Sequence, residues 1–180
     1  LSEDGSATFV STNGDITMVN ASNDFNELSL TANNAQIVDI NDVTITDSQL
    51  TDSLHVEANG QLTVGTISAG ESIYLDAGLG AILSAQSDLT ASQITLRATT
   101  GIGTGSYDNL ISEAADTSGV INLHSANLNA INSSSGIVHL SNDQDMTITN
   151  LRNNGDIVLS NSGDILLQVT TIDGTATEQG

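Results

Sequence analysis

Carboxylates are the side chains that could do chemistry in this 180-residue chain, which has 22 Asp and Glu residues. Asp143 and Asp145 alternate around one residue, and a second acidic group lies close together in the sequence: Asp39, Asp42, Asp47 and Asp52. Carboxylate oxygens are preferred ligands of Ca²⁺. The glycine-rich calcium nonapeptide and the EF-hand loop are absent from the sequence, so solvated corners that confer solubility are the favoured interpretation. We expect no metal site and no cofactor, with Ca²⁺ at stacked Asp corners as the alternative.

Catalytic groups do not occur in a recognisable motif. A glycoside hydrolase would use two carboxylates across a groove, which sequence spacing alone does not exclude. A polysaccharide lyase typically uses a cationic base or a calcium–carboxylate cluster, and the chain has no Lys and only Arg97 and Arg152. No local motif suggests a Ser-His-Asp triad, and Gly101-Ile102-Gly103 lacks the rest of a nucleotide fingerprint. We therefore expect no catalytic residues and no enzymatic activity.

The formal net charge of −20 limits the partners of the protein. Nucleic acid and anionic lipid are poor partners of a polyanion, and no apolar run approaches the roughly 20 residues of a membrane span. Cys and Pro are absent, and Ser, Thr, Asn, Asp and Gly fill the spaces between regularly placed apolar residues. That mixture favours short strands and tight corners over helices. Because the chain begins at Leu1 and shows no signal peptide, we expect it to be an excerpt of a longer protein.

The clearest pattern is Gly-Asp-Ile-x-Leu, which occurs at 155–159 and again at 163–167. Apolar residues at i and i+2 lie on one face of a strand, and the Gly permits a corner. From residue 43 onward such apolar positions recur every 20 residues or so, in three families. The first family is Val43, Leu62, Ile82, Ile102, Leu128, Met146 and Ile165. The second is Leu54, Ile73, Ile94, Ile121, Val138 and Ile157, and the third is Leu50, Ile67, Leu89, Leu110, Ile131, Leu151 and Ile172.

Three short strands in each period predict one coil of a parallel β-solenoid, a wound ribbon whose like strands stack about 4.8 Å apart. We therefore predict an all-β fold: a right-handed parallel β-helix of three-strand coils of about 20 residues. The whole of 1–180 is expected to form one solenoid segment that is least regular at 1–42. Two families each contain one longer step, from Ile102 to Leu128 and from Ile94 to Ile121, which predicts a loop insertion near 103–119.

Two other all-β folds are less consistent with this pattern. A β-sandwich would need hairpin turns and more aromatic core residues than this chain offers, and a left-handed solenoid would need strict hexapeptide spacing. A single coil buries too little apolar surface to offset its conformational entropy. Stacking is therefore essential, and both end coils are expected to be adhesive edges that further coils or further copies cover.

Residues between the inward positions are expected to point outward and to form columns. One column is predicted to contain Thr44, Thr63 and Thr147, and another His55, Tyr74, Thr95, Asn122 and His139. All three histidines, His55, His124 and His139, are expected on the surface, with His55 and His139 about four coils apart. An ice-binding Thr face is disfavoured because Leu83 and Leu166 interrupt it.

The repeats also resemble a known family. The stretch QITLRATTGIG at 93–103 is similar to the I-x-L-x-A-x-x-G-I-G turns of filamentous-haemagglutinin-like repeats, as are SGVINL at 118–123, SGIVHL at 135–140 and both Gly-Asp-Ile-x-Leu units. The resemblance covers about residues 54–172. It implies a right-handed parallel β-helix within a very large bacterial protein that is secreted or anchored at the cell surface. The secretion-signal domain that the family normally carries at its N-terminus has no match here.

Two functions follow as hypotheses. The first is a non-enzymatic structural segment of a secreted or cell-surface bacterial adhesin or extracellular filament shaft, whose partners are further coils or copies joined end to end or side by side. The second is a carbohydrate-binding or carbohydrate-cleaving β-helix that uses the 103–119 insertion, with Tyr107 as a stacking platform for surface glycans.

Overall fold

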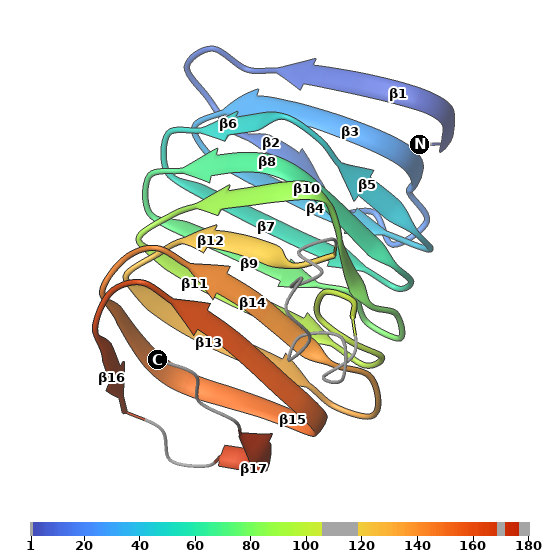
Figure 1. Cartoon of the computed structure of the whole chain (residues 1–180). Helices are drawn as coiled ribbons and strands as arrows, with labels where there is room; N and C mark the ends of the chain where they lie inside the picture. The colour runs from blue at the N-terminus through green and yellow to red at the C-terminus, as the bar shows by residue number, and fades with distance from the viewer. Residues whose placement is uncertain (1, 106–118, 169–171, 177–180) are drawn as a thin grey trace.

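The computed structural model of the chain describes residues 2–105, 119–168 and 172–176, and these form an all-β solenoid of about eight turns. Successive turns advance by roughly 19 residues, and Figure 1 shows them winding in a right-handed sense. The strands are β1 (Ser2–Val10), β2 (Ile16–Met18), β3 (Asp24–Ala32), β4 (Ala35–Asp39), β5 (Val43–Ile45), β6 (Ser48–Leu50), β7 (Ser53–Ala58), β8 (Leu62–Ala69), β9 (Ser72–Asp76), β10 (Ile82–Thr90), β11 (Gln93–Ala98), β12 (Ile121–His124), β13 (Asn127–Asn132), β14 (Val138–Asn142), β15 (Met146–Asn161), β16 (Ile165–Leu167) and β17 (Ile172–Ala176).

The strands stack in three parallel ladders, one on each face of the coil. Ladder 1 contains β2, β4, β7, β9, β11, β13, the first part of β15, and β16. Ladder 2 contains β5 and the first halves of β3, β8, β10 and β14. Ladder 3 contains β6, β12 and the second halves of those four strands; β1 stacks on β3, and the end of β15 stacks on β14. The predicted three-strand coil is therefore confirmed, although one bent strand often supplies two of its faces. Among the described residues no helix is long or apolar enough to cross a membrane.

Alternation along each strand explains why the ladders form. In β7, Leu54 and Val56 are fully buried while His55 between them points outward, and the pattern recurs in β9 with Ile73 and Leu75. Inward aliphatic side chains of successive coils thus lie directly above one another and form one continuous core. The backbone groups of each coil are paired by the coils above and below, which is why stacking stabilises what a single coil cannot.

Most of the predicted stacking is confirmed up to the insertion. Leu54, Ile73 and Ile94 pair in register in ladder 1, and the first family stacks through ladder 2 in the order Val43, Leu62, Ile82 and Ile102. Two neighbours of the third family, Ile67 and Leu89, also pair. The first forty residues form β1 to β4, which pair in parallel, with one register shift in β1 between Glu3 and Ser6.

Across the insertion the predicted families are wrong because they exchange ladders, although three later steps are confirmed: Met146 with Ile165, Val138 with Ile157, and Leu151 with Ile172. Ile94 pairs with Leu128, not Ile121, while Ile102 pairs with Val138, not Leu128. Within ladder 1, Leu128 then pairs with Ile148 instead of Met146. The third family fails at two further points. Leu50 pairs with Ala69, and Ile131 is a half-buried position beside Arg152; Leu110 lies outside the described residues.

One long coil causes this exchange. Ile94 and Leu128 are stacked neighbours, although they lie much farther apart in sequence than one ordinary coil. The chain leaves ladder 2 after Ile102 and returns at Gly119, where the N–H of Thr104 donates a 2.8 Å hydrogen bond to the Gly119 carbonyl. Most of the insertion predicted near 103–119 lies outside the described residues, and the coil that contains it extends from Ile94 to Leu128 instead of ending at Ile121.

Buried asparagines close several corners, which the spacing of apolar residues did not predict. Asn132 and Asn153 stack at the corner after ladder 1, where the Asn132 Nδ2 donates to the Asn153 Oδ1 at 2.7 Å. Asn142 and Asn161 stack in the same way at 2.8 Å, on ladder 3 where its strands end. Their amides also bond the corner backbone, so buried peptide groups are satisfied without water. The sequence did contain a signal for these pairs, because the two asparagines of each pair are separated by about one coil.

The first coil leaves its inward side chains only partly covered. Four apolar side chains of β1 and β2 are half-buried against the core: Ala7, Phe9, Ile16 and Met18. Phe9 packs edge to face on Phe25, with ring centroids 6.2 Å apart. Val10 at the end of β1 is 63% exposed. In Figure 1 β1 is the outermost strand at the N-terminal end, and β3 is the only partner that the described residues give it.

Candidate functional site

The four clustered acidic residues do not form one site. Asp39 and Asp42 lie at the corner between ladders 1 and 2, Asp47 at the next corner and Asp52 at the third. The Asp42 Oδ1 accepts a 2.6 Å hydrogen bond from the Gln61 N–H of the following coil. These carboxylates, although close in sequence, are therefore distributed over three corners of a single coil.

Asp39 is the one carboxylate of this group that is buried, with 2% of its surface exposed. Its Oδ2 accepts a 2.8 Å hydrogen bond from the Phe25 N–H, and its Oδ1 a 3.1 Å bond from the Asn41 N–H. Burial raises the pKa of Asp39 above its usual value, and these two hydrogen bonds oppose the shift. Asp39 thus satisfies backbone donors beside the core, as the buried asparagines do farther along.

Asp143 and Asp145 also act separately, both at the corner between β14 and β15. The Asp145 Oδ1 accepts a 2.9 Å hydrogen bond from the Asp164 N–H of the next coil. The Asp143 Oδ1 lies 2.7 Å from the Nδ1 of His124 on the preceding coil. Among the described residues, no group of three or more His, Cys, Asp or Glu side chains is placed to hold a metal ion.

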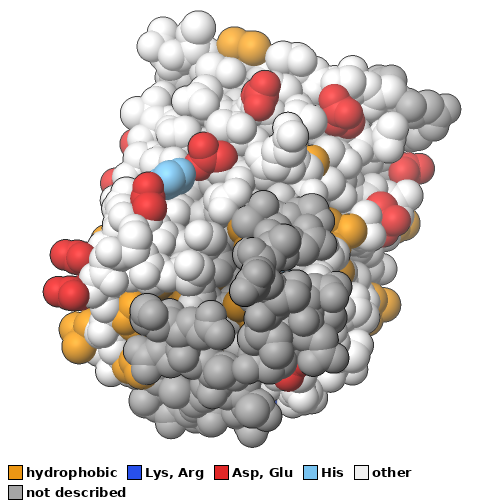
Figure 2. All heavy atoms as spheres, viewed as in Figure 1, with side chains coloured by type: hydrophobic (Ala, Val, Ile, Leu, Met, Phe, Trp, Pro, Cys, Tyr) orange, Lys and Arg blue, Asp and Glu red, His pale blue; other side chains and the backbone are white. Residues whose placement is uncertain are grey.

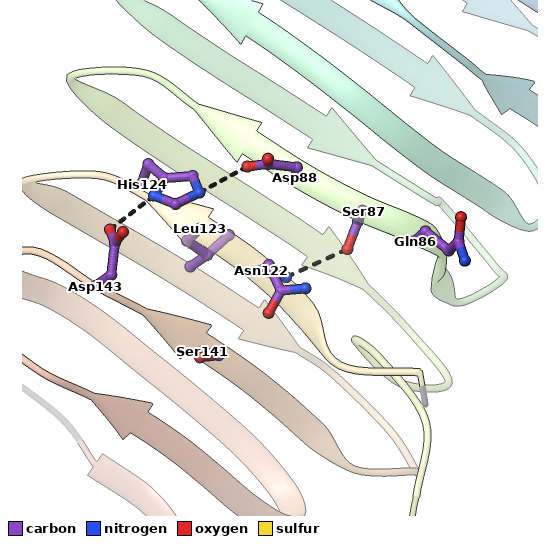
Figure 3. A pocket seen from close by; sticks show the side chains of 8 residues that line it. All are labelled: Gln86, Ser87, Asp88, Asn122, Leu123, His124, Ser141 and Asp143. Carbon is purple, nitrogen blue, oxygen red and sulfur yellow. Dashed lines mark hydrogen bonds and ion pairs between the residues drawn. The ribbon is translucent and has the colours of Figure 1, made fainter. Parts of the chain in front are cut away.

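The most distinctive arrangement is centred on His124, at the end of β12. Figure 3 shows its ring between two carboxylates: Nδ1 is 2.7 Å from the Asp143 Oδ1, and Nε2 is 2.7 Å from the Asp88 Oδ1. These residues line an open groove of about 340 Å³ together with Gln86, Ser87, Asn122, Leu123 and Ser141. Figure 2 shows this face with acidic side chains and a histidine but no Lys or Arg among its coloured atoms. The His124 ring therefore lies between carboxylates from two other coils.

His55 lies on the outside of ladder 1, as expected. Its ring stacks on Tyr74 of the next coil with centroids 4.4 Å apart, and its Nε2 lies 2.8 Å from the Glu57 Oε1. The Tyr74 hydroxyl donates to the Asp76 Oδ2 at 3.3 Å. Burial of the ring, and secondly the Asp76 carboxylate, raise the pKa of Tyr74 above its ordinary value. The His55 and Tyr74 rings therefore stack on each other along the rod.

His139 corrects two expectations. It lies on the outer side of ladder 2, not on the face of His55, and only 4% of it is exposed. The first residues of the insertion cover it, and its Nδ1 is 2.8 Å from the Thr104 carbonyl oxygen. Because a carbonyl only accepts, this nitrogen is the donor. The prediction that the His139 side chain points outward from β14 is correct. The alternation of residues gave no indication that Thr104 would cover the ring.

The predicted outward columns are confirmed only before the insertion. His55, Tyr74 and Thr95 stack as expected, but the next member is Asn129, since Asn122 belongs to ladder 3. Thr44 and Thr63 pair in ladder 2, whereas Thr147 lies in ladder 1. The proposed glycan platform, Tyr107, lies outside the described residues.

Comparison with known proteins gives no relative for the chain. No protein-family model matches the sequence, and no curated protein or solved structure matches it. The solenoid architecture and the contacts above are therefore the basis for assigning a function.

Proposed function

We propose that the chain is a non-enzymatic structural segment of a secreted or cell-surface bacterial adhesin or extracellular filament, in which it forms part of the shaft. The observation that carries this proposal is the continuous parallel stacking of about eight coils around one aliphatic core. Such a stack extends in one direction by adding identical steps, which suits a spacer or fibre. The similarity of its repeats to filamentous-haemagglutinin-like turns supports the extracellular bacterial setting.

The positions of the chemically capable side chains support a structural role. Asp42 and Asp145 each accept a backbone N–H from the following coil. His124 connects carboxylates of two neighbouring coils, and His55 stacks on the coil next to it. Each of these groups links one turn of the solenoid to another, as residues that stabilise a rod would do.

The N-terminal coil supports end-to-end assembly. Its inward side chains Ala7, Phe9, Ile16 and Met18 remain half-buried, and the adjoining interior coils bury the equivalent positions almost completely. A further coil, supplied by another copy or by any other β-solenoid segment, would bury them and pair the outer edge of β1. We infer that this end is the contact surface for assembly.

The test is concentration-dependent association, measured by sedimentation velocity on the purified chain. Val10→Lys places a charge at the exposed end of β1 without touching the core, and we expect it to weaken self-association by roughly tenfold or more. Leu79→Lys is the matched control, because Leu79 is 71% exposed at a corner in mid-rod and should have no effect.

Two results would overturn parts of the proposal. Association weakened by Leu79→Lys but not by Val10→Lys would mean that rods join side by side. Hydrolase or lyase activity of the purified chain on polysaccharides would contradict a purely structural role.

A further inference from the structure

β12 is the strand that resumes the stack after the insertion. It is four residues long, and it pairs with β10 on one side and β14 on the other. His124 is its last residue. Because Asp88 comes from β10 and Asp143 follows β14, the His124 ring spans three successive coils at this point.

The two contacts of the ring are not equivalent. The Asp143 Oδ1 forms a hydrogen bond with Nδ1 at 2.7 Å. The Asp88 Oδ1 lies 2.7 Å from Nε2, yet this oxygen is buried and has no partner with hydrogen-bond geometry. The Asp88 side chain as a whole is 49% exposed, so leaving this one oxygen without a donor has a modest cost. The nearby positive charge of a protonated ring would compensate it.

The number of protons on the ring decides whether both contacts are favourable. Neutral imidazole has one N–H and one lone pair, whereas imidazolium has two N–H donors. The neutral ring can donate its one N–H to Asp143, but it carries no charge that would attract the Asp88 carboxylate 2.7 Å from Nε2. Only the protonated ring attracts both carboxylates.

We propose that His124 is a proton-operated clamp that holds the coil after the insertion to the coils on both of its sides. Protonation closes the clamp, and deprotonation releases the Asp88 side of it. Histidine is the side chain that ordinarily changes charge between about pH 5 and pH 8. The clamp therefore makes this part of the rod more stable in mildly acidic surroundings. The inference does not depend on the proposed function, since it concerns the stability of the coils alone.

The groove contains few other charged groups that could contribute to the pH dependence attributed to His124. Asp88 from β10 and Asp143 after β14 are the titratable groups that line it beside His124. The remaining lining residues are uncharged: Gln86, Ser87, Asn122, Leu123 and Ser141. Repulsion among the many acidic side chains of this protein also changes with pH. The test therefore compares variants in which this repulsion is nearly the same.

Asp88→Asn is the informative substitution. Its amide can donate to the lone pair of a neutral ring but cannot attract a protonated one electrostatically. We expect the variant to unfold about 2–4 °C below the natural protein at about pH 5.5, and the difference to disappear or reverse at about pH 8.5. Thermal unfolding monitored by circular dichroism gives both values.

Asp145→Asn is the matched control at the neighbouring corner. Asp145 accepts a backbone N–H and has no histidine contact among the described residues, so the difference that it causes should be the same at both pH values. Nitrogen NMR of the His124 ring provides an independent readout and should show both nitrogens protonated at about pH 5.5. A pH-independent effect of Asp88→Asn, or a ring that is neutral at that pH, would refute the clamp.

Discussion

At the scale of single residues, buried polar side chains at the corners carry much of the specificity of this solenoid. Asp39, Asn132 and Asn153 occupy equivalent places at the end of ladder 1, and each bonds backbone groups that the turning chain leaves unpaired. Intervening coils place Ala58 and Ala98 there instead. At corners with alanine other groups make the bonds, for example the Asp76 Oδ1, which accepts from the Gly78 N–H at 2.8 Å.

The Asn153 side chain offers a direct test of this role. It is fully buried, its Nδ2 donates to the carbonyls of Gly136 and Asp156, and its Oδ1 accepts from Asn132. Asn153→Ala leaves these groups without partners, and we expect a loss of about 2–4 kcal/mol in the free energy of unfolding. Urea unfolding measures it.

The adjacent residue provides the control for that substitution. Asn154 is exposed and makes a single side-chain bond of 3.2 Å, to Ser133. Asn154→Ala should therefore change the free energy of unfolding by no more than about 0.5 kcal/mol. Equal effects of the two substitutions would show that the buried ladder is not what stabilises the corner.

At the scale of elements, the insertion depends on a glycine at its base. Gly103 has φ of +77°, and a Cβ there would lie 2.7 Å from the His139 carbonyl oxygen. The chain must pass this close to β14 in order to leave the ladder. A side chain at Gly103 is therefore excluded both by the backbone conformation and by space.

Gly103→Ala should cost about 1–3 kcal/mol in unfolding free energy, again measured with urea. Gly65→Ala is the matched substitution, since Gly65 lies in β8 at the same side of the solenoid and a Cβ there would be 3.5 Å or more from its neighbours. We expect that variant to be neutral or slightly more stable. A tolerated Gly103→Ala would mean that the base of the insertion is not as the structure has it.

The elements also show why the sequence predicted the strand register before the insertion but not the register across it. Apolar pairs at i and i+2 occur on all three ladders, so Ile121 and Leu128 are equally good continuations of Ile94 by pattern alone. The insertion between Ile102 and Ile121 moves the chain from ladder 2 to ladder 3 without interrupting the rhythm of apolar residues. Before the loop, one period without ambiguity sufficed to stack Leu54, Ile73 and Ile94 correctly.

The candidate site was beyond prediction for a related reason. Asp88, His124 and Asp143 meet only when β10, β12 and β14 are placed in neighbouring coils, across the long insertion. A register that continues Ile94 with Ile121 could not bring them together. The burial of His139 likewise depends on the path of the insertion, which the spacing of apolar residues does not encode.

At the scale of the whole molecule, stability is shared between neighbouring coils. Each coil is covered by the one before and the one after, and the first coil, with its half-buried Phe9 and Met18, shows the consequence of lacking a neighbour. In such a one-dimensional stack, changes at the end should affect assembly, and changes in the middle should affect folding. Val10→Lys and Asn153→Ala therefore probe different properties of one rod.

Disulfide trapping tests the stacked register itself. Because the sequence has no natural cysteines, only the introduced pair can form a disulfide within the chain. Thr95 and Asn129 are paired neighbours in ladder 1, within the Cα separation of about 4.4–6.8 Å that a disulfide requires. Thr95→Cys combined with Asn129→Cys should oxidise to an internal disulfide, identified by peptide mass spectrometry without reductant. Thr95→Cys combined with Asn122→Cys, the pair that an exchanged register would bring together, should stay reduced. A disulfide in the second pair and none in the first would contradict the solenoid as described.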